Sequence, residues 1–315
     1  MEYALSKILH AEVSCDEILT TQKENFTATQ KQRLTELNAP AEVCGETFGS
    51  ASLRDDRFRK LEAAYARQNR DKLITLVEEI HNPLALRLEA ALSERLMEEE
   101  GFTRVVTPII ISAASLEKMT ITGDHPLARQ VFWLNEKGAG KEPGKSDKCL
   151  RPMLAPGLYV LMRDMHRILK RPVRIFECGP CFRKETQGAK HMNEFTMLNL
   201  VEHAANENRQ MERLKELAHI LMKVATDVSG EDINYELITA ESEVYGKTLD
   251  IMVNDIEIGS GSFGPHPLDD NWGVCEPWVG IGIGIERLAM VMGGYSSIKR
   301  WGRSTAYVDG TRLNI

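Results

Sequence analysis

The sequence predicts an α+β fold, with a mostly antiparallel sheet flanked by helices and a helical N-terminal region. Residues 1–80 are strongly polar, with apolar residues at spacings of three and four. Residues 82–101 carry a clear helical pattern. After Gly101 the pattern changes to short β-rich runs joined by links of hairpin length, and helices do not alternate strictly with strands. These features favour an antiparallel or mixed sheet over a doubly wound parallel one.

Composition excludes several classes of protein. A chain of 315 residues with 43% hydrophobic content is long and apolar enough for one large domain and an appendage, and it is not a disordered chain. Its net charge of −7 excludes coating of nucleic acid through bulk positive charge, so RNA binding has to come from a local site. No run approaches eighteen apolar residues, and the six cysteines lack the spacing of a disulfide framework. We therefore expect a cytoplasmic protein that does not enter membranes.

Residues 1–81 form the predicted helical N-terminal region, and residues 82–315 form the predicted catalytic domain. Two apolar stripes predict helices in the first part: Phe58, Leu61 and Tyr65, then Leu73, Val77 and Ile80. Asn82-Pro83 then offers an N-cap followed by proline at the first helical position. Leucine recurs every four residues until Gly101 supplies a C-terminal stop: Leu84, Leu88, Leu92 and Leu96.

The remaining elements are short. We expect strands at residues 105–111, 130–134, 173–176, 195–201 and 255–258. Two further helices are expected at residues 156–169 and 206–228. Residues 135–148 are rich in glycine, lysine and proline and are expected to form an exposed hairpin tip.

Two segments separated by a short glycine-containing turn carry the first chemical motif. Phe182-Arg183-Lys184-Glu185 precedes the turn, and His191-Met192-Asn193-Glu194-Phe195 follows it. Side chains alternate along a strand, so antiparallel pairing would place two sets of side chains on one sheet face: Arg183 and Glu185, with Phe195, Met197, Asn199 and Val201. That face suits a phosphate, an adenine edge and a stacked base. Alone, R-x-E is more often a surface ion pair.

A second motif spans residues 278–290 and reads WVGIGIGIERLAM. Three glycines at alternate positions leave bare backbone on one strand face, so that a ligand can approach closely. Arg287 would lie at the start of the following apolar helix and face that ligand. The glycines alone also fit a packing device, and their spacing is not that of the dinucleotide fingerprint. The Glu-Arg pair and apolar helix that follow make the pattern more specific.

A third segment is the helix that runs through Gly101 into a strand ending at Pro108. In order along the chain, the three segments resemble motifs 1, 2 and 3 of the class II aminoacyl-tRNA synthetases. The resemblance implies the core of that class and a homodimer formed through residues 101–108.

Further segments resemble the catalytic domain of the pyrrolysyl-tRNA synthetase family within this class. They read CLRPMLAP at residues 149–156, IFECGPCFRKE at 175–185, EFTMLN at 194–199 and VYGKTLD at 244–250. The resemblance covers roughly residues 84–315. Longer members carry a basic RNA-binding domain with Cys and His residues, to which this chain shows no counterpart, so we expect the form without it. The implied activity is ATP-dependent activation of pyrrolysine and its transfer to the cognate tRNA.

The resemblance also implies roles for residues that match the family's motifs. Arg183 is expected to contact the α-phosphate of ATP and Glu185 the adenine edge. Phe195 and Arg287 are expected to sandwich the base, and the two arginines are the expected catalytic residues. Glu257 and Ser260 are expected to hold Mg²⁺ with the phosphates. Because residues three apart lie on opposite strand faces, this pair needs a bulge or turn near Gly259.

The substrate pocket is expected to be apolar. Four residues at spacings of three and four share one helix face: Ala155, Leu158, Tyr159 and Met162. By resemblance the pocket also includes Asn199, Val201, Trp278 and Gly280, with Tyr245 as a lid. None of these residues is acidic, whereas the ammonium group of free lysine would need a buried carboxylate. A long side chain like that of an acylated lysine fits better, with Asn199 bonding its amide. Without the resemblance, the apolar positions would be assigned to ordinary core.

Alternatives stay open. Met162 and Val201 stand where the family usually shows Leu and Cys, so a class II synthetase for a different amino acid is one alternative. A non-catalytic tRNA-binding paralogue is another, although such a protein has no need for a set of residues that binds ATP and Mg²⁺. Cys178-x-x-Cys181 would suit zinc or redox chemistry, but no second pair exists. For tRNA, either residues 1–81 make contact or a separate small tRNA-binding protein assists.

Overall fold

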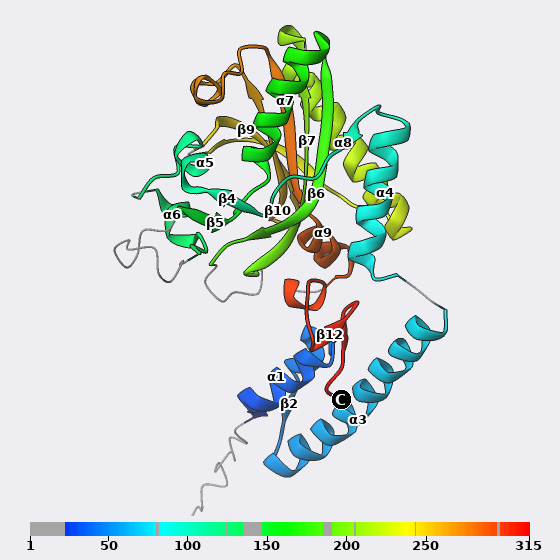
Figure 1. Cartoon of the computed structure of the whole chain (residues 1–315). Helices are drawn as coiled ribbons and strands as arrows, with labels where there is room; N and C mark the ends of the chain where they lie inside the picture. Colours follow the sequence, from blue (N-terminus) through cyan, green and yellow to red (C-terminus); the bar gives the residue numbers. More distant parts are fainter. Residues whose placement is uncertain are drawn as a thin grey trace, which may run out of the picture. The chain divides into compact units, whose positions relative to one another are not determined.

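A computed structural model of the chain describes residues 23–79, 82–123, 125–134, 147–184, 191–204, 206–242, 244–294 and 297–315 (Figure 1). The chain divides into two compact units, residues 1–74 with residue 315, and residues 75–314. The expected domain boundary between residues 81 and 82 stays a prediction. Within the described ranges, no helix combines the length and the apolar character needed to cross a bilayer.

The smaller unit is mostly helical. Its elements are β1 (Glu24–Asn25), α1 (Ala28–Glu36), α2 (Ala41–Cys44), β2 (Thr47–Phe48) and α3 (Ala51–Glu78). Thr27 caps α1 in a capping box with Gln30. Phe26, Leu34 and Leu61 form the core, against which Phe58 and Tyr65 pack, so the first predicted stripe is confirmed.

The second predicted stripe of this region is wrong. Leu73 and Val77 belong to the same long helix as the first stripe, and Val77 is 66% exposed. Ile80 lies outside the described residues. A spacing of three and four therefore predicted the helix correctly but not the burial of its C-terminal end.

The larger unit holds all three sequence motifs. Its helices are α4 (Leu84–Glu98), α5 (Ala113–Lys118), α6 (Pro126–Gln130), α7 (Ala155–Leu169), α8 (Gln210–Ser229) and α9 (Ile285–Met292). Its strands are β3 (Thr103–Arg104), β4 (Ile110–Ser112), β5 (Lys148–Leu150), β6 (Val173–Phe182), β7 (Glu194–His203), β8 (Glu236–Ser242), β9 (Gly246–Val253), β10 (Ile256–Gly264), β11 (Trp278–Gly284), β12 (Tyr307–Val308) and β13 (Thr311–Arg312). Short 3₁₀ turns occupy residues 207–209, 267–272 and 298–300.

A seven-stranded sheet in the order β3-β6-β7-β11-β10-β9-β8 dominates this unit. All neighbours in it are antiparallel except β3 and β6, which are parallel. The fold is therefore the mostly antiparallel, helix-flanked α+β arrangement that the sequence predicts.

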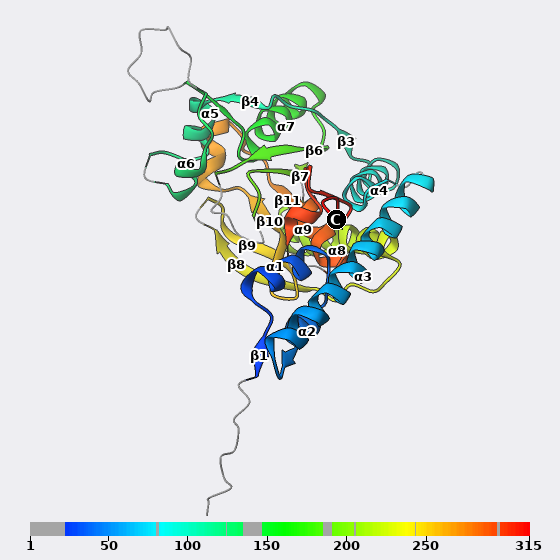
Figure 2. The same ribbon diagram turned by 90° about the horizontal axis from the view of Figure 1, so that it is seen from below.

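Helices cover both faces of the sheet. On one face, α4, α8 and α9 pack against even-numbered residues of β6 and β7 such as Phe176 and Leu200. On the other face lies α7, which packs against odd-numbered residues such as Ile175 and Val201. Figure 2 shows α7 and α8 on opposite sides of β6 and β7. The first face is filled, and the second is where the cavity described below opens.

Helix α4 follows its predicted pattern closely. All four leucines of the predicted stripe are buried, and Leu88, Leu92 and Leu96 are fully inaccessible. The N-cap position falls at Pro83, one residue later than the predicted Asn82, so the helix begins at Leu84. Gly101 has a φ of +71°, a conformation that favours glycine, and the chain turns there into β3.

The prediction of one continuous strand at residues 105–111 is wrong. Val105 still donates its N–H to the Phe176 carbonyl, but the N–H of Thr107 bonds the Glu177 side chain instead of the sheet. Pro108 has no N–H to donate. The chain therefore leaves the sheet after β3 and pairs again only at β4, with β5 as its partner.

The strand predicted at residues 130–134 is also wrong. Gln130 ends α6, which His125 caps and Pro126 begins. Residues 131–134 are extended beside β5 but form only one bridge, from Trp133 to Cys149. Of the expected hairpin tip at 135–148, residues 135–146 lie outside the described part. The strands predicted at 173–176, 195–201 and 255–258 are confirmed but extend further, and both predicted helices are confirmed.

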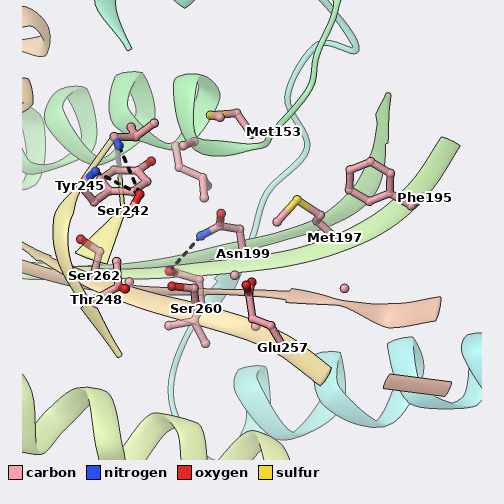
Figure 3. A pocket seen from close by; sticks show the side chains of 18 of the residues that line it. Met153, Phe195, Met197, Asn199, Ser242, Tyr245, Thr248, Glu257, Ser260 and Ser262 are labelled. Atoms are coloured by element: carbon pink, nitrogen blue, oxygen red, sulfur yellow. Dashed lines mark hydrogen bonds between the residues drawn. The ribbon is translucent and has the colours of Figure 1, made fainter. Parts of the chain in front are cut away.

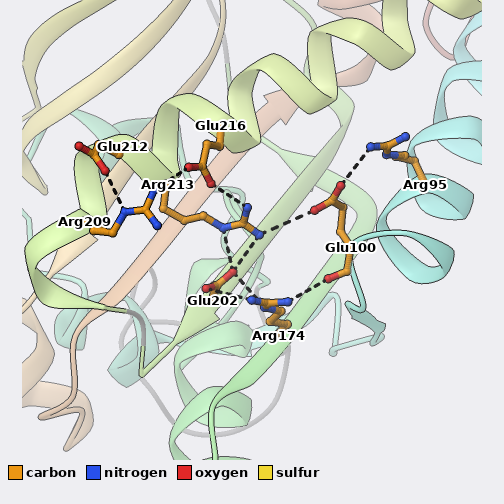
Figure 4. A network of polar contacts seen from close by, with 8 residues as sticks. All are labelled: Arg95, Glu100, Arg174, Glu202, Arg209, Glu212, Arg213 and Glu216. Carbon is orange, nitrogen blue, oxygen red and sulfur yellow. Dashed lines mark hydrogen bonds and ion pairs between the residues drawn. The ribbon is translucent and has the colours of Figure 1, made fainter.

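A network of charged side chains ties α4, β6, β7 and α8 together at one end of the sheet (Figure 4). The Glu202 carboxylate accepts from Arg174 at 3.0 Å and from Arg213 at 3.1 Å. Arg213 also approaches Glu100, which pairs with Arg95. Because several charges share partners here, the network contributes more to the stability of the fold than isolated surface ion pairs do.

Candidate functional site

A cavity of about 370 Å³ opens between α7 and the sheet face that α7 covers. Its walls include every described residue that the sequence proposes for the site: Ala155, Leu158, Tyr159, Met162, Arg183, Phe195, Asn199, Val201, Tyr245, Glu257, Ser260, Trp278, Gly280 and Arg287. Glu185 lies outside the described residues. Arg183 directly follows β6, and the others come from strands β7, β10 and β11, helices α7 and α9 and the β8–β9 turn.

The first motif forms the predicted antiparallel pair at the cavity mouth. Cys181 lies opposite Phe195, and the backbone N–H of Arg183 extends the ladder to the Asn193 carbonyl at 3.0 Å. The Arg183 guanidinium carbon lies 5.3 Å from the centre of the Phe195 ring, and its Nε donates to the Pro152 carbonyl at 2.9 Å. The guanidinium is therefore held over an aromatic ring with its orientation fixed.

The second motif supplies bare backbone and a second guanidinium. Gly280, Gly282 and Gly284 all line the cavity along β11. A Cβ at Gly280 would lie 3.0 Å from the Leu200 carbonyl oxygen, so glycine is required for packing as well as for access. Arg287 lies in the first turn of α9 and donates to the backbone carbonyl of Glu257 at 2.8 Å. Both guanidinium groups thus line one cavity.

Glu286, the residue before Arg287, anchors helix α9 to the sheet. Its buried carboxylate accepts from the backbone N–H and the hydroxyl of Thr196, both at 2.8 Å. Burial raises the pKa of Glu286, and the hydrogen bonds from Thr196 oppose that shift. The pair joins α9 to β7, the two elements that carry Arg287 and Phe195.

Glu257 and Ser260 both line the cavity because β10 is irregular between them. Glu257 pairs with Met252, while Gly259 pairs with Ile251, so the register shifts between Glu257 and Gly259. This is the bulge that the sequence required. The Ser260 hydroxyl donates to the Asp250 carboxylate at 2.6 Å. Figure 3 shows Glu257 and Ser260 on the same side of the cavity.

The deep end of the cavity is aromatic and rests on a buried carboxylate. Tyr159 stacks on Trp272 at 5.3 Å and meets Trp278 edge-on at 5.8 Å. Asp269, which is 2% exposed, accepts from the Tyr159 hydroxyl at 2.9 Å and from the Trp278 Nε1–H at 2.8 Å. Burial raises the pKa of Tyr159, and Tyr245 and Asp269 raise it further, so the phenol stays a neutral donor.

Asp269 was not among the residues predicted for the site. It lies in the 3₁₀ turn of residues 267–272, outside every motif, and only the folded chain brings its carboxylate behind Tyr159 and Trp278. Asp269 is not itself among the residues of the cavity wall.

Asn199 supplies the amide group in the middle of the cavity. Its Nδ2 donates to the Ile281 carbonyl at 3.2 Å, and in Figure 3 its amide oxygen points toward α7. On the β11 side its neighbours across the sheet are Gly282 and then Ser260, so no large side chain covers the amide from that side. A ligand amide can therefore bond there.

Tyr245, the expected lid residue, lies in the turn between β8 and β9. The backbone N–H groups of Val244 and Tyr245 donate to the Ser242 hydroxyl at 3.2 and 3.4 Å (Figure 3). Its ring meets the rings of His266 and Trp278, each at 6.3 Å between centres. Burial raises the pKa of Tyr245, so its hydroxyl is a neutral hydrogen-bonding group.

Sequence reasoning missed several lining residues, among them Met153, His191, Met192, Ser242, Thr248 and Ser262. Ser262 was within reach, because it lies two residues after Ser260 and strand alternation places both on one face. The others depend on tertiary packing of loops and strand ends.

Cys178 and Cys181 do not form a metal or redox pair. Three residues apart on β6, they lie on opposite faces, Cys178 in the core beneath α4 and α8 and Cys181 in the core beneath α7. Both are free thiols, and burial raises the pKa of Cys181 to about 12. Within the described ranges, no three His, Cys, Asp or Glu residues cluster as metal ligands.

The cavity thus has two chemically different ends. The mouth presents two guanidiniums, an aromatic ring and, from β10, a carboxylate with a hydroxyl, which suit an anionic and planar ligand. The deep end is apolar and aromatic with one amide on the way, which suits a long uncharged chain. Two ligands bound end to end would meet between Arg183 and Asn199.

Comparison with known proteins agrees with this geometry. The model of the tRNA synthetases class II core domain (F) matches residues 80–306. Among curated proteins, the chain is similar to O-phosphoserine–tRNA(Cys) ligases, 27% identical over 158 residues to that of Methanocorpusculum labreanum and 24% over 185 residues to that of Methanopyrus kandleri. These matches cover 48% and 53% of this chain but only 29% and 33% of the relatives.

Solved structures give closer matches. A pyrrolysyl-tRNA synthetase from Desulfitobacterium hafniense superposes with a TM-score of 0.83 at 44% identity, covering 93% of this chain and 99% of that one. A second structure from the same organism gives 0.81 at 43% identity, covering 93% and 96%. The chain belongs to the pyrrolysyl-tRNA synthetases, a family of class II aminoacyl-tRNA synthetases.

Proposed function

We propose that the protein activates pyrrolysine with ATP and transfers it to the cognate tRNA. The observation that carries this proposal is the single cavity in which a cationic, aromatic mouth continues into an apolar end with one amide. Family membership supports the same reaction, since the D. hafniense relative is a pyrrolysyl-tRNA synthetase.

ATP would bind at the mouth. Phe195 and Arg287 would hold the adenine between them, and Arg183 would contact the α-phosphate. The substrate carboxylate is already ionised and attacks the α-phosphorus directly, so no general base is needed. Arg183 and Arg287 would stabilise the charge that develops as pyrophosphate leaves. The tRNA terminal hydroxyl then attacks the acyl group of the adenylate and releases AMP.

Glu257 and Ser260 fit Mg²⁺. Both offer oxygen atoms on the same side of the cavity, and a carboxylate with substrate phosphates is the ligand set that Mg²⁺ prefers. The ion, when bound, would neutralise phosphate charge. Asp250 would orient Ser260 through the 2.6 Å hydrogen bond.

The deep end selects the amino acid. Free lysine would bring an ammonium group next to Leu158, Met162 and Val201, where no described lining residue could pair with it. O-Phosphoserine, the substrate named for the curated relatives, would need cations there, whereas the described arginines of the wall lie at the mouth. An acylated lysine buries its neutral end against Tyr159 and Trp278 and bonds Asn199 through its amide.

We also infer a homodimer formed through residues 101–108 and the segment that follows. Val106 is 85% exposed and Ile110 is 52% exposed, and both line a shallow groove with Pro108. Apolar surface of this kind marks an interface. Val106→Asp should convert a dimer to a monomer in light scattering; a monomeric wild-type protein would refute the assignment.

For tRNA, we propose that residues 1–81 contribute contacts. Helix α3 presents exposed basic side chains, among them Arg67, Arg70 and Lys72. Reversing the charge of Arg67 and Arg70 should weaken tRNA binding and reduce its salt dependence. Unchanged binding would favour a separate small tRNA-binding protein instead.

A cytoplasmic location is consistent with the free thiols of Cys149, Cys178 and Cys181.

Amino-acid-dependent ATP–pyrophosphate exchange tests the proposal. We expect exchange with pyrrolysine and none with lysine or O-phosphoserine. Exchange with a standard amino acid alone would indicate a different class II specificity, and no exchange with any amino acid would indicate a tRNA-binding paralogue without catalysis.

A further inference from the structure

We propose that Ser262 determines specificity by donating a hydrogen bond to an acceptor atom at the far end of the substrate side chain. This inference rests on the proposed function, because it assigns a role within the same amino-acid pocket. It adds a polar contact at an end of the cavity that is otherwise aromatic and apolar.

Ser262 is buried and faces the cavity. The residue is only 7% exposed, and its Oγ has no hydrogen-bond partner among the described residues. It lines the cavity and appears in Figure 3 close to Tyr245 and Thr248. A buried hydroxyl without a partner is destabilising unless something else bonds it. A ligand in the cavity can supply that partner.

The register of the sheet places Ser262 beyond the amide of Asn199. Ser260, Gly282 and Asn199 lie in one row across β10, β11 and β7. Ser262, Gly280 and Val201 form the next cavity-facing row, two residues and roughly 7 Å further in. Gly280 has no side chain to close this row. A side chain whose amide bonds Asn199 therefore carries its terminal group past Ser262.

Three other hydroxyl groups of this wall have partners within the protein. Those of Ser260 and Thr248 donate to the Asp250 carboxylate at 2.6 and 3.1 Å. The Ser242 hydroxyl accepts from two backbone N–H groups of the turn that carries Tyr245. The Ser262 hydroxyl, by contrast, neither donates nor accepts a hydrogen bond among the described residues. It would favour a terminal group with a ring nitrogen or ether oxygen over a hydrocarbon ring.

A pair of matched substrates tests this role. Nε-(tetrahydrofuran-2-carbonyl)-lysine and Nε-(cyclopentanecarbonyl)-lysine share the same amide and nearly the same shape, but only the first has an acceptor in its ring. For each substrate, kcat/KM for ATP–pyrophosphate exchange is measured with the wild-type protein and with Ser262→Ala, which removes one oxygen atom.

The two substrates should respond in opposite directions. Ser262→Ala should lower kcat/KM for the ether by about three- to tenfold, because its acceptor loses a partner. The same variant should raise kcat/KM for the hydrocarbon, because no hydroxyl is then buried without a bond. A change by the same factor for both substrates would overturn the proposal.

Thr248→Val is the matched control, since Thr248 lines the same wall but its hydroxyl bonds Asp250. We expect it to shift both substrates by one factor; opposite shifts would show that loss of any hydroxyl has this effect and would overturn the assignment of Ser262. If the proposed function itself is wrong, the result is different: the wild-type protein then shows no ATP–pyrophosphate exchange with any acylated lysine, pyrrolysine included.

Discussion

The hydroxyl group of Tyr159 donates a 2.9 Å hydrogen bond to the carboxylate of Asp269, a residue behind the wall of the amino-acid pocket. The same carboxylate accepts from the Trp278 indole and from the backbone N–H of His266, each at 2.8 Å. One buried anion thus fixes two aromatic walls of the pocket. Its three donors compensate for its removal from water.

Replacing Asp269 by Asn should disturb these walls. The amide group keeps one acceptor oxygen and turns N–H groups toward existing donors, so the free energy of unfolding should fall by about 2–3 kcal/mol. The KM for the amino acid should rise by about tenfold while the KM for ATP changes little. Tyr159→Phe removes only one donor and should cost about 1 kcal/mol. An unchanged amino-acid KM in Asp269→Asn would refute the positioning role.

His203 should make the protein less stable in mild acid. Burial, with a smaller effect of the neighbouring His166, lowers the pKa of His203 to about 4 from its ordinary 6.5. The unfolded chain therefore takes up this proton more readily than the folded one between those values. The stability present above pH 6.5 should be lost progressively as the pH falls to 4, by up to about 3 kcal/mol.

Denaturant unfolding of wild type and His203→Phe across pH 4–7 measures this contribution. Phenylalanine does not titrate, so the difference between the two stability curves should shrink or reverse toward pH 4. Curves that stay parallel would contradict the assignment.

Arg183 should be sensitive even to a change that keeps its charge. Its Nε donates to Pro152, and its planar group lies over Phe195. We expect Arg183→Ala to slow exchange by about 10²–10³. Arg183→Lys should remain at least about tenfold slower than wild type, because an ammonium group lacks both the plane and the fork of donors. Full activity of the lysine variant in exchange assays would show that charge alone suffices.

Glu257 and Asp250 should govern the Mg²⁺ requirement. Glu257→Gln removes a proposed ligand charge, and Asp250→Asn loosens Ser260. The Mg²⁺ concentration for half-maximal exchange should rise by about tenfold in Asp250→Asn and by more in Glu257→Gln. Glu276→Gln, a change at an exposed residue outside the cavity wall, serves as the control. Equal Mg²⁺ dependence in all four proteins would argue against this site.

Regular periodicity made much of the fold predictable. The leucine stripe of α4 and the alternation in β6 and β7 follow from local geometry, and so does the placement of Phe195 and Asn199 on one face. The need for a bulge near Gly259 also follows from the spacing of two residues along one strand. Such features depend on neighbours in sequence.

The features that sequence did not predict depend on distant partners. Residues 105–111 leave the sheet because Thr107 bonds Glu177, 70 positions away. Asp269 acts on Tyr159 across 110 positions. Val77 has an apolar side chain in a helix but lies exposed. Periodicity predicts the helix but does not show which of its turns pack against other elements.

A crystal structure with a non-hydrolysable ATP analogue and pyrrolysine tests the two-ended cavity most directly. We expect the adenine between Phe195 and Arg287, and the pyrrolysine side chain running past Asn199 to Ser262, Tyr159 and Trp278. Density for either ligand outside this cavity, or for both at the same end of it, would contradict the account.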